Sequence, residues 1–192
     1  MRRDGAANRE SVLLAAEQVF GEKGAAASTE EIARRAQVSI ATVFRNFPTK
    51  QDLIEATAAR YLDGLTGQAR HLADSISDPA EAFTTLLRTL VSVGAAKMAL
   101  MDLLPPHGDD GQGLSPQVIS AADTFLGTVG LALERAQTAG AARADVTVED
   151  VSLLLRALAH VTTPGGDEAV ERALRIVLDG LGVPNQLIRR AT

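Results

Sequence analysis

Cysteine and tryptophan are both absent from this chain of 192 residues. The absence of cysteine excludes disulfide bonds, thiolate nucleophiles and zinc sites built from cysteine. Histidine is scarce as well, because only His71, His107 and His160 occur, far apart and without the paired spacing of metal ligands. We therefore expect no metal site and no cofactor.

Long apolar runs are also missing. No run approaches the roughly 20 residues that a membrane-spanning helix needs, and the first residues, MRRDGAANRE, lack the apolar segment of a signal peptide. Hydrophobic residues nevertheless make up 46% of the chain and charged residues 22%, which is typical of a folded globular protein. We therefore expect a cytoplasmic protein that binds no membrane.

Loops of known catalytic or ion-binding type are not found. Asp109 and Asp110 lack EF-hand spacing, and Gly165 and Gly166 lack both the preceding strand and the lysine of a phosphate-binding loop. No group of serine, histidine and acidic residues stands out as a catalytic set. We expect that the protein is not an enzyme and has no catalytic residue.

Charge is distributed unevenly along the chain, whose net charge is −5. Residues 1–60 contain 9 Lys and Arg against 8 Asp and Glu, whereas the remainder contains 10 against 16. The acidic remainder is unsuited to bind nucleic acid. The near-neutral N-terminal part can do so if its basic side chains gather on one face, because attraction to phosphates is local.

Apolar residues recur at helical spacing along the whole chain, and no segment shows the alternation of a strand. Ser28, Ser39 and Thr49 stand where N-caps are expected. The pattern predicts helices at 9–23, 29–36, 40–47, 50–75, 79–104, 116–138, 148–161 and 167–182. We expect an all-α protein of about nine helices. A three-helix helix-turn-helix domain, residues 1–50 and the first turns of the next helix, would precede a helical bundle regulatory domain, residues 51–192.

The helix at 40–47 has the size and chemistry of a DNA recognition helix. Val43 and Phe47 share its inward face, and the outward positions are Ala41, Thr42, Arg45 and Asn46. Arginine pairs well with guanine, asparagine with adenine, and small methyl groups with thymine. Lys50, at the head of the following helix, suits a backbone phosphate. Short helices with a polar face also occur in other all-α domains, so the pattern alone leaves a purely structural role open.

The run STEEIARRAQVSIATVFRNFPTK, residues 28–50, closely resembles the DNA-binding signature of the TetR family of bacterial transcriptional regulators. The similarity extends over roughly residues 8–60. The resemblance implies a homodimeric repressor that binds a double-stranded, palindromic DNA operator and is released by a small apolar or amphipathic ligand. The alternative is a TetR-like protein that acts architecturally or through a protein partner, without a small-molecule ligand. A helical enzyme or interaction module is a third reading, which failure to bind any DNA would favour.

Carried over by position, the resemblance implies phosphate contacts from Thr29, Phe44 and Lys50. It implies groove contacts from Ser39, Ile40, Ala41, Thr42, Arg45 and Asn46. Two positions depart from the family pattern. Gln37 replaces a glycine that suits a turn residue with positive φ, so the chain either bears about 1 kcal/mol of strain there or adjusts the turn. Phe44 replaces a common tyrosine, so no hydroxyl is available to a phosphate.

The C-terminal helices carry two further sets of candidate residues. One set would line the ligand cavity that the resemblance implies, or would simply form core: Phe83, Leu87, Met98, Met101, Leu104, Phe125, Val129 and His160. The other set forms two apolar stripes that would meet those of a second copy in a four-helix bundle: Val151, Leu154, Leu155, Leu158, Val170, Leu174, Val177, Leu178 and Leu181. The competing explanation for both stripes is that they pack inward on the preceding helices.

Overall fold

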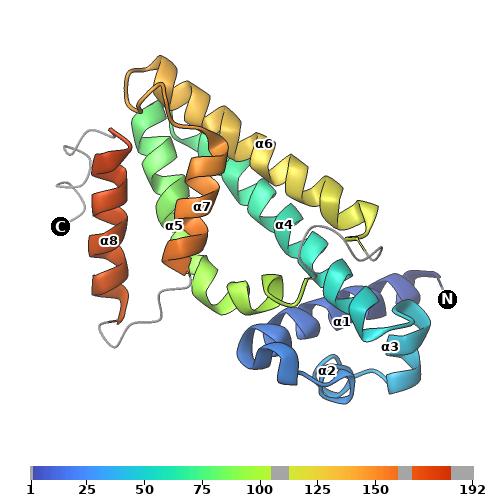
Figure 1. Ribbon diagram of the computed structural model, residues 1–192. Coiled ribbons are helices and arrows are strands. Elements are labelled where there is room, and N and C mark those ends of the chain that lie inside the picture. Colours follow the sequence, from blue (N-terminus) through green and yellow to red (C-terminus); the bar gives the residue numbers. More distant parts are fainter. Residues whose placement is uncertain (1, 105–112, 160–165, 183–192) are drawn as a thin grey trace. The chain divides into compact units, whose positions relative to one another are not determined.

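The computed structural model describes residues 2–104, 113–159 and 166–182, and within these ranges the chain forms helices joined by short connections, with no strand (Figure 1). The helices of the described ranges are α1 (Arg2–Lys23), the short 3-10 helix η1 (Gly24–Ala26), α2 (Thr29–Arg35), α3 (Ile40–Asn46), α4 (Lys50–Ser75), α5 (Pro79–Met101), α6 (Pro116–Thr138), α7 (Val148–Ala159) and α8 (Gly166–Gly180). The predicted all-α fold is confirmed. None of the described helices is both long and apolar enough to span a bilayer.

Side-chain caps fix where several of these helices begin. The hydroxyl of Ser28 accepts from the backbone N–H of Glu31 at 3.2 Å at the start of α2. At the start of α4, Asp52 accepts from the backbone N–H of Thr49 at 2.9 Å, and the Thr49 hydroxyl accepts from the N–H of Asp52 at 3.0 Å. These bonds satisfy N–H groups that have no partner within the helix, so the predicted starts coincide with the observed ones.

The start of α1 differs from the prediction. The helix begins at Arg2, whereas the apolar spacing predicts a start at Arg9. The intervening segment, RDGAAN, carries no apolar face that helical periodicity can detect.

The chain divides into two compact units, each made of two segments. Unit 1 comprises Met1–Asp63 and Ala96–Ala122, and unit 2 comprises Gly64–Ala95 and Asp123–Thr192. The long helices α4, α5 and α6 each contribute one part to each unit. The sequence shows where helices begin and end, but it does not show which distant segments pack together. The predicted division at residue 50 therefore assumes two continuous domains.

The core of unit 1 is formed mainly by α1, α2, α3 and the first part of α4. Phe20, Ile32, Val43 and Leu53 are fully buried there. Leu100, from the end of α5, is also fully buried in this cluster although it lies far away in sequence. The helix-turn-helix is therefore held by apolar packing that includes a segment outside residues 1–50.

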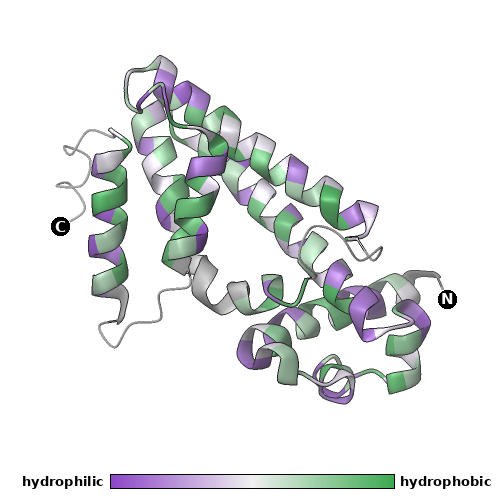
Figure 2. Cartoon of the chain, in the orientation of Figure 1, coloured by the Kyte–Doolittle hydropathy of each residue, from purple (hydrophilic) through white to green (hydrophobic). Residues whose placement is uncertain are grey.

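The core of unit 2 is formed by parts of α5, α6, α7 and α8. Phe83, Leu87, Leu174 and Leu178 are fully buried in it. Helices α7 and α8 contact each other, and Figure 2 shows hydrophobic and hydrophilic residues alternating along α8. The apolar side chains of α8 that are buried in this core, such as Leu174 and Leu178, hold the helix in unit 2.

Candidate nucleic-acid interface

A Schellman motif ends α2 and produces the turn that leads to α3. The backbone N–H of Val38 donates to the carbonyl of Ala33 at 3.0 Å, and that of Gln37 donates to the carbonyl of Arg34 at 3.2 Å. Gln37 has a φ of +58°, in the left-handed region that favours glycine. The turn therefore keeps the geometry that glycine would adopt, and Gln37 bears the steric cost.

Helix α3 has one buried face and one exposed face. Val43 is 1% exposed and Phe47, the residue that ends the helix, is 2% exposed. Within α3 the exposed residues are Ile40, Ala41, Phe44 and Arg45. The two buried residues hold the helix on the core of unit 1, which directs the four exposed residues toward solvent.

The polar side chains beside the exposed face bond mainly to one another. The hydroxyl of Ser39 accepts from the backbone N–H of Thr42 at 3.2 Å and lies 2.9 Å from the Thr42 hydroxyl. The side-chain amide of Asn46 donates to the carbonyl of Thr42 at 2.8 Å. Arg45, in contrast, has no described ion pair or hydrogen bond. Its guanidinium, which no described bond restricts, is the side-chain group on α3 best able to meet a base edge.

Lys50 connects the start of α4 to the segment before α2. Its ammonium group donates to the carbonyl of Ala25 at 3.1 Å. A carbonyl does not neutralise the charge, so Lys50 remains a positive group at the first position of α4. The contact holds this charge beside η1, just before α2.

Other cations of unit 1 are committed to carboxylates. Arg35 binds both oxygens of Glu22 at 2.8 and 3.0 Å, and Lys23 binds Glu31 at 2.6 Å. The hydrogen bond from Arg35 lowers the pKa of Glu22, and the bond from Lys23 lowers the pKa of Glu31. These pairs join α1 to α2 and leave Lys23 and Arg35 less available to phosphates than Arg45 and Lys50.

Arg9 is a candidate that the sequence did not reveal. Its guanidinium lies 5.0 Å from the centre of the Phe47 ring, so it is held at the end of α3 by a cation–π contact. Arg9 is exposed and has no described carboxylate partner. No motif includes it, since only the packing of α1 against α3 brings it to this face.

All nine residues predicted for DNA contact lie in unit 1, at the start of α2, along α3 with its cap, and at the start of α4. Thr29, Thr42, Asn46 and Lys50 are half-buried, and the other five are exposed. The arrangement of two short helices, a tight turn and an exposed face with uncommitted positive charge is that of a DNA-reading helix-turn-helix.

Residues 12–57 match the family "Bacterial regulatory proteins, tetR family", and residues 78–183 match "Transcriptional regulator SbtR-like, C-terminal domain". The second match alone spans more than half of the chain. The chain belongs to the TetR family. It is therefore a DNA-binding transcriptional regulator, and the resemblance seen in residues 28–50 is confirmed.

Similar proteins agree with this assignment. A crystal structure of the TetR transcription regulatory protein from Mycobacterium vanbaalenii is 37% identical, covers 94% of this chain and 98% of its own, and has a TM-score of 0.71. The HTH-type transcriptional repressor KstR2 of Rhodococcus jostii (strain RHA1) is 27% identical over 92% of each chain. The regulator FadR from Bacillus subtilis, in complex with stearoyl-CoA, shares the fold at 16% identity, with 91% and 99% of the two chains covered and a TM-score of 0.68.

The residues predicted for the ligand cavity of this TetR protein are divided between the two units. Phe83, Leu87 and Val129 are buried in the core of unit 2, and Phe125 packs against them. Met101 and Leu104 pack against the core of unit 1 instead. His160 and the side chain of Met98 lie outside the described residues, as do His107, Asp109, Asp110 and Gly165. Four of the eight residues are thus brought together, as packed core.

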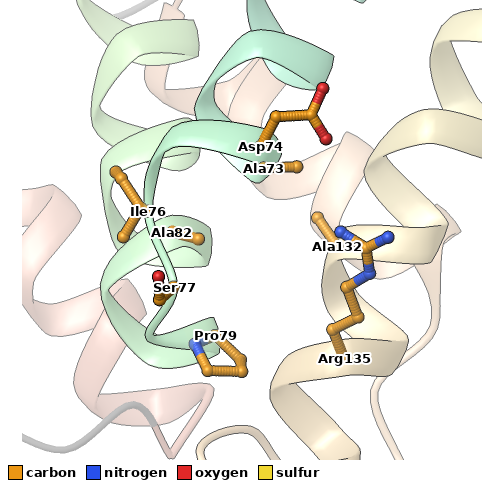
Figure 3. A pocket seen from close by; sticks show the side chains of 8 residues that line it. All are labelled: Ala73, Asp74, Ile76, Ser77, Pro79, Ala82, Ala132 and Arg135. Carbon is orange, nitrogen blue, oxygen red and sulfur yellow. The ribbon is translucent and has the colours of Figure 1, made fainter.

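Two cavities stand out among the described residues of unit 2, and neither is lined by any of those eight residues. The first, of about 140 Å³, lies between the α4–α5 connection and α6. Figure 3 shows Ala132 and Arg135 of α6 facing the other lining residues, which are Ala73, Asp74, Ile76, Ser77, Pro79 and Ala82. The second, of about 280 Å³, is lined by Leu126, Val148, Glu149, Ser152, Leu153 and Arg156. Within the described residues no group of three His, Cys, Asp or Glu is arranged to hold a metal ion.

The nine residues predicted for the dimer interface lie on α7 and α8 or directly after α8, facing the core of unit 2. Five are buried within the single chain: Val151, Leu158, Leu174, Leu178 and Leu181. The remaining four are partly buried against the same cluster: Leu154, Leu155, Val170 and Val177. A side chain buried in its own chain offers no surface to a second copy. Among the described residues of these helices, the large apolar side chains left exposed are Leu153, at 68%, and Ile176, at 72%.

Proposed function

We propose that this regulator is a homodimeric repressor that binds a palindromic operator through α3 and leaves it when a small apolar or amphipathic molecule binds. The observation that carries the DNA part is the exposed face of α3, where Arg45 has no described partner. Thr29, Lys50 and the newly found Arg9 would contact phosphates or sugars around that face. Ser39, Ile40, Ala41, Thr42, Arg45 and Asn46 would lie in the groove. The repressor role draws on the similarity to KstR2, which is described as a repressor.

The dimer is supported by exposed apolar side chains on two adjacent helices. Leu153 on α7 and Ile176 on α8 are each more than two-thirds exposed, which is costly unless another surface covers them. A second copy related by a two-fold axis would cover both and form a four-helix bundle. Two recognition helices then enter successive major grooves, roughly 34–36 Å apart. The partly buried stripe residues Leu154, Leu155, Val170 and Val177 would border this contact.

Analytical ultracentrifugation tests the dimer. Leu153→Glu combined with Ile176→Glu should give monomers with unchanged helical content, and should abolish tight binding to a palindromic operator. Leu14→Glu provides the matched control, because Leu14 is 46% exposed on α1 and should leave the dimer intact. A wild-type protein that sediments as a monomer at micromolar concentration, yet binds a palindrome tightly, would contradict the proposal.

The ligand part rests on the packed cluster of Phe83, Leu87, Phe125 and Val129 in unit 2. An apolar ligand would have to separate these side chains, and the change in packing would then alter the distance between the two recognition helices. The fold alone links this chain to FadR, whose structure holds stearoyl-CoA. Thermal-shift measurements with free fatty acids and their coenzyme A thioesters, followed by operator-release assays with any hit, test this part.

A specific observation favours the ligand-independent alternative. The two cavities lined by the described residues of unit 2, at about 140 and 280 Å³, are smaller than the roughly 300–1,000 Å³ of typical ligand pockets. If no compound raises the melting temperature or releases the operator while specific DNA binding is retained, this regulator acts without a small-molecule ligand. Release of the operator by a stabilising compound would exclude that alternative.

A further inference from the structure

The exposed face of α3 is mostly apolar. Of its four exposed residues, only Arg45 is charged. Ile40 is 37% exposed and Phe44 is 44% exposed, and their spacing of four residues places them side by side on the helix. Ala41 is exposed beside them. We call Ile40, Ala41 and Phe44 the α3 apolar face.

The hydrogen-bonding groups next to this face already make bonds within α3 and its cap. The Ser39 and Thr42 hydroxyls lie 2.9 Å apart, and the Asn46 amide donates to the carbonyl of Thr42 at 2.8 Å. Each of these groups keeps further donors or lone pairs, but the bonds it already makes restrict the directions in which it can meet a base. Arg45 makes no described bond that restricts it, so α3 offers a freely oriented guanidinium and an adjacent apolar surface.

The major groove of DNA has one apolar feature that matches such a surface. Thymine carries a methyl group at C5 that projects into the groove, whereas cytosine and uracil carry hydrogen at that position. Burial of a methyl group against aliphatic or aromatic carbon is favourable and needs no hydrogen-bond geometry. A phenylalanine ring and an isoleucine side chain provide such carbon on the two turns of α3.

We propose that the α3 apolar face reads thymine methyl groups, and that Ile40 and Phe44 thereby determine part of the operator sequence. This inference rests on the proposed function, in which α3 lies in the major groove. Arg45 would select a guanine in the same half-site. Phe44, which lacks the hydroxyl that would bind a phosphate, acquires a role in sequence recognition instead.

The test begins with selection of duplexes from random DNA by the full-length protein. Each thymine of the selected half-site is then replaced in turn by deoxyuridine, which removes only the methyl group. At one or two thymines the replacement should weaken binding about fourfold for each buried methyl. Where cytosine replaces such a thymine, its 5-methyl form should recover a similar factor.

Substitutions connect the effect to α3. Ile40→Ala and Phe44→Ala should remove the difference between thymine and uracil at the thymines that each residue contacts. Both residues are exposed, so helical content and melting temperature should stay unchanged. Leu14→Ala, an equally exposed apolar position on α1, should preserve the difference in full.

The outcomes separate the inference from the function on which it rests. If the protein enriches no duplex, the proposed DNA binding through α3 is overturned and the inference with it. If it enriches a duplex on which every uracil replacement is neutral, the inference alone is overturned. The same conclusion follows if the uracil effect persists in both α3 variants, since the methyl groups would then act through DNA stiffness.

Discussion

Helices α2–α3 and helices α7–α8 are both short amphipathic pairs, but they use their apolar residues differently. In α3 the buried positions are Val43 and Phe47, and the apolar residues Ile40 and Phe44 remain exposed. In α8 the apolar stripe faces the core of unit 2, where Leu174 and Leu178 are fully buried, whereas Ile176 is exposed. The comparison teaches that an apolar stripe signals burial without identifying what covers it. Residues outside the stripe are the better candidates for contact with another molecule.

The largest expected effect is the difference in stability between a substitution on the buried side of α8 and one on its exposed side. Leu178→Ala should lower the free energy of unfolding by about 2–5 kcal/mol, because it leaves a cavity in the core of unit 2. Ile176→Ala should change the stability of the dissociated chain by no more than about 0.5 kcal/mol. Urea unfolding followed by circular dichroism, at low protein concentration, measures both. Equal costs for the two variants would mean that α8 is not packed on unit 2 in this orientation.

The next largest effect is the difference in operator affinity between substitutions of exposed arginines on α3 and on α8. Arg45→Ala should weaken binding to the selected operator by about 1–3 kcal/mol and relax preference at one base pair. Asn46→Ala should cost less, since the Asn46 amide is bonded to the carbonyl of Thr42. Arg172→Ala, on α8, is the control and should leave affinity unchanged. Fluorescence anisotropy on matched and mismatched duplexes decides, and an equal loss from Arg45→Ala on every sequence would reduce Arg45 to a phosphate contact.

A substitution in the turn between α2 and α3 should change the free energy of unfolding by about 1 kcal/mol. Gln37→Gly should stabilise the protein by that amount, because glycine adopts the φ of +58° without a steric penalty. Gln18→Gly, at an exposed position inside α1, should instead destabilise it by a similar amount, because glycine there only adds entropy to the unfolded chain. Melting temperatures that move in the same direction for both variants would show that Gln37 bears no strain.

Removing a positive side chain that contacts a phosphate should weaken binding to all DNA sequences alike. Lys50→Ala and Arg9→Ala should each reduce the slope of log affinity against log salt by about one, because one released counterion belongs to each neutralised phosphate. Arg175→Ala, on α8, should leave the slope unchanged. Titrations from low to moderate salt check this, and an unchanged slope for Arg9→Ala would assign Arg9 to packing on Phe47 alone.

The smallest effect concerns the carboxylate that binds the start of α6 within unit 1. Burial alone raises the pKa of Glu55, but hydrogen bonds from Gln51 and Ser115 outweigh it, so the pKa lies below its ordinary value of 4.5. A lowered pKa means that this stabilisation is present above about pH 4.5 and is lost as the pH falls through the folded-state pKa. The stability difference between wild type and Glu55→Gln should therefore shrink below about pH 4.5.

Asp150 offers the matched comparison in unit 2. Its pKa is lowered by the backbone and hydroxyl groups of Thr147, which donate to it at 2.9 Å. Asp150→Asn should show the same direction of pH dependence. Differential scanning calorimetry between pH 3 and pH 7 measures both, and a constant difference across that range would show that neither carboxylate is stabilised in its charged form.

The sequence by itself determined the helices, most of their ends and the helix-turn-helix. These features depend on interactions over a few residues: the spacing of apolar side chains, the reciprocal cap of Thr49 and Asp52, and the stop at Pro48. The signature in residues 28–50 also identified the family, since its positions span two helices and a turn. Such signals need no knowledge of distant segments.

Only the tertiary structure decided which distant segments meet. It brought Arg9 to the ring of Phe47, gave Leu100 to the core of unit 1, and enclosed Leu174 and Leu178 within unit 2. It also showed that the Asn46 amide donates to the carbonyl of Thr42, whereas the Arg45 guanidinium has no described partner. The physical reason is that helical periodicity records how far a side chain turns about its own axis, whereas the partner of each face is set by the packing of the whole chain.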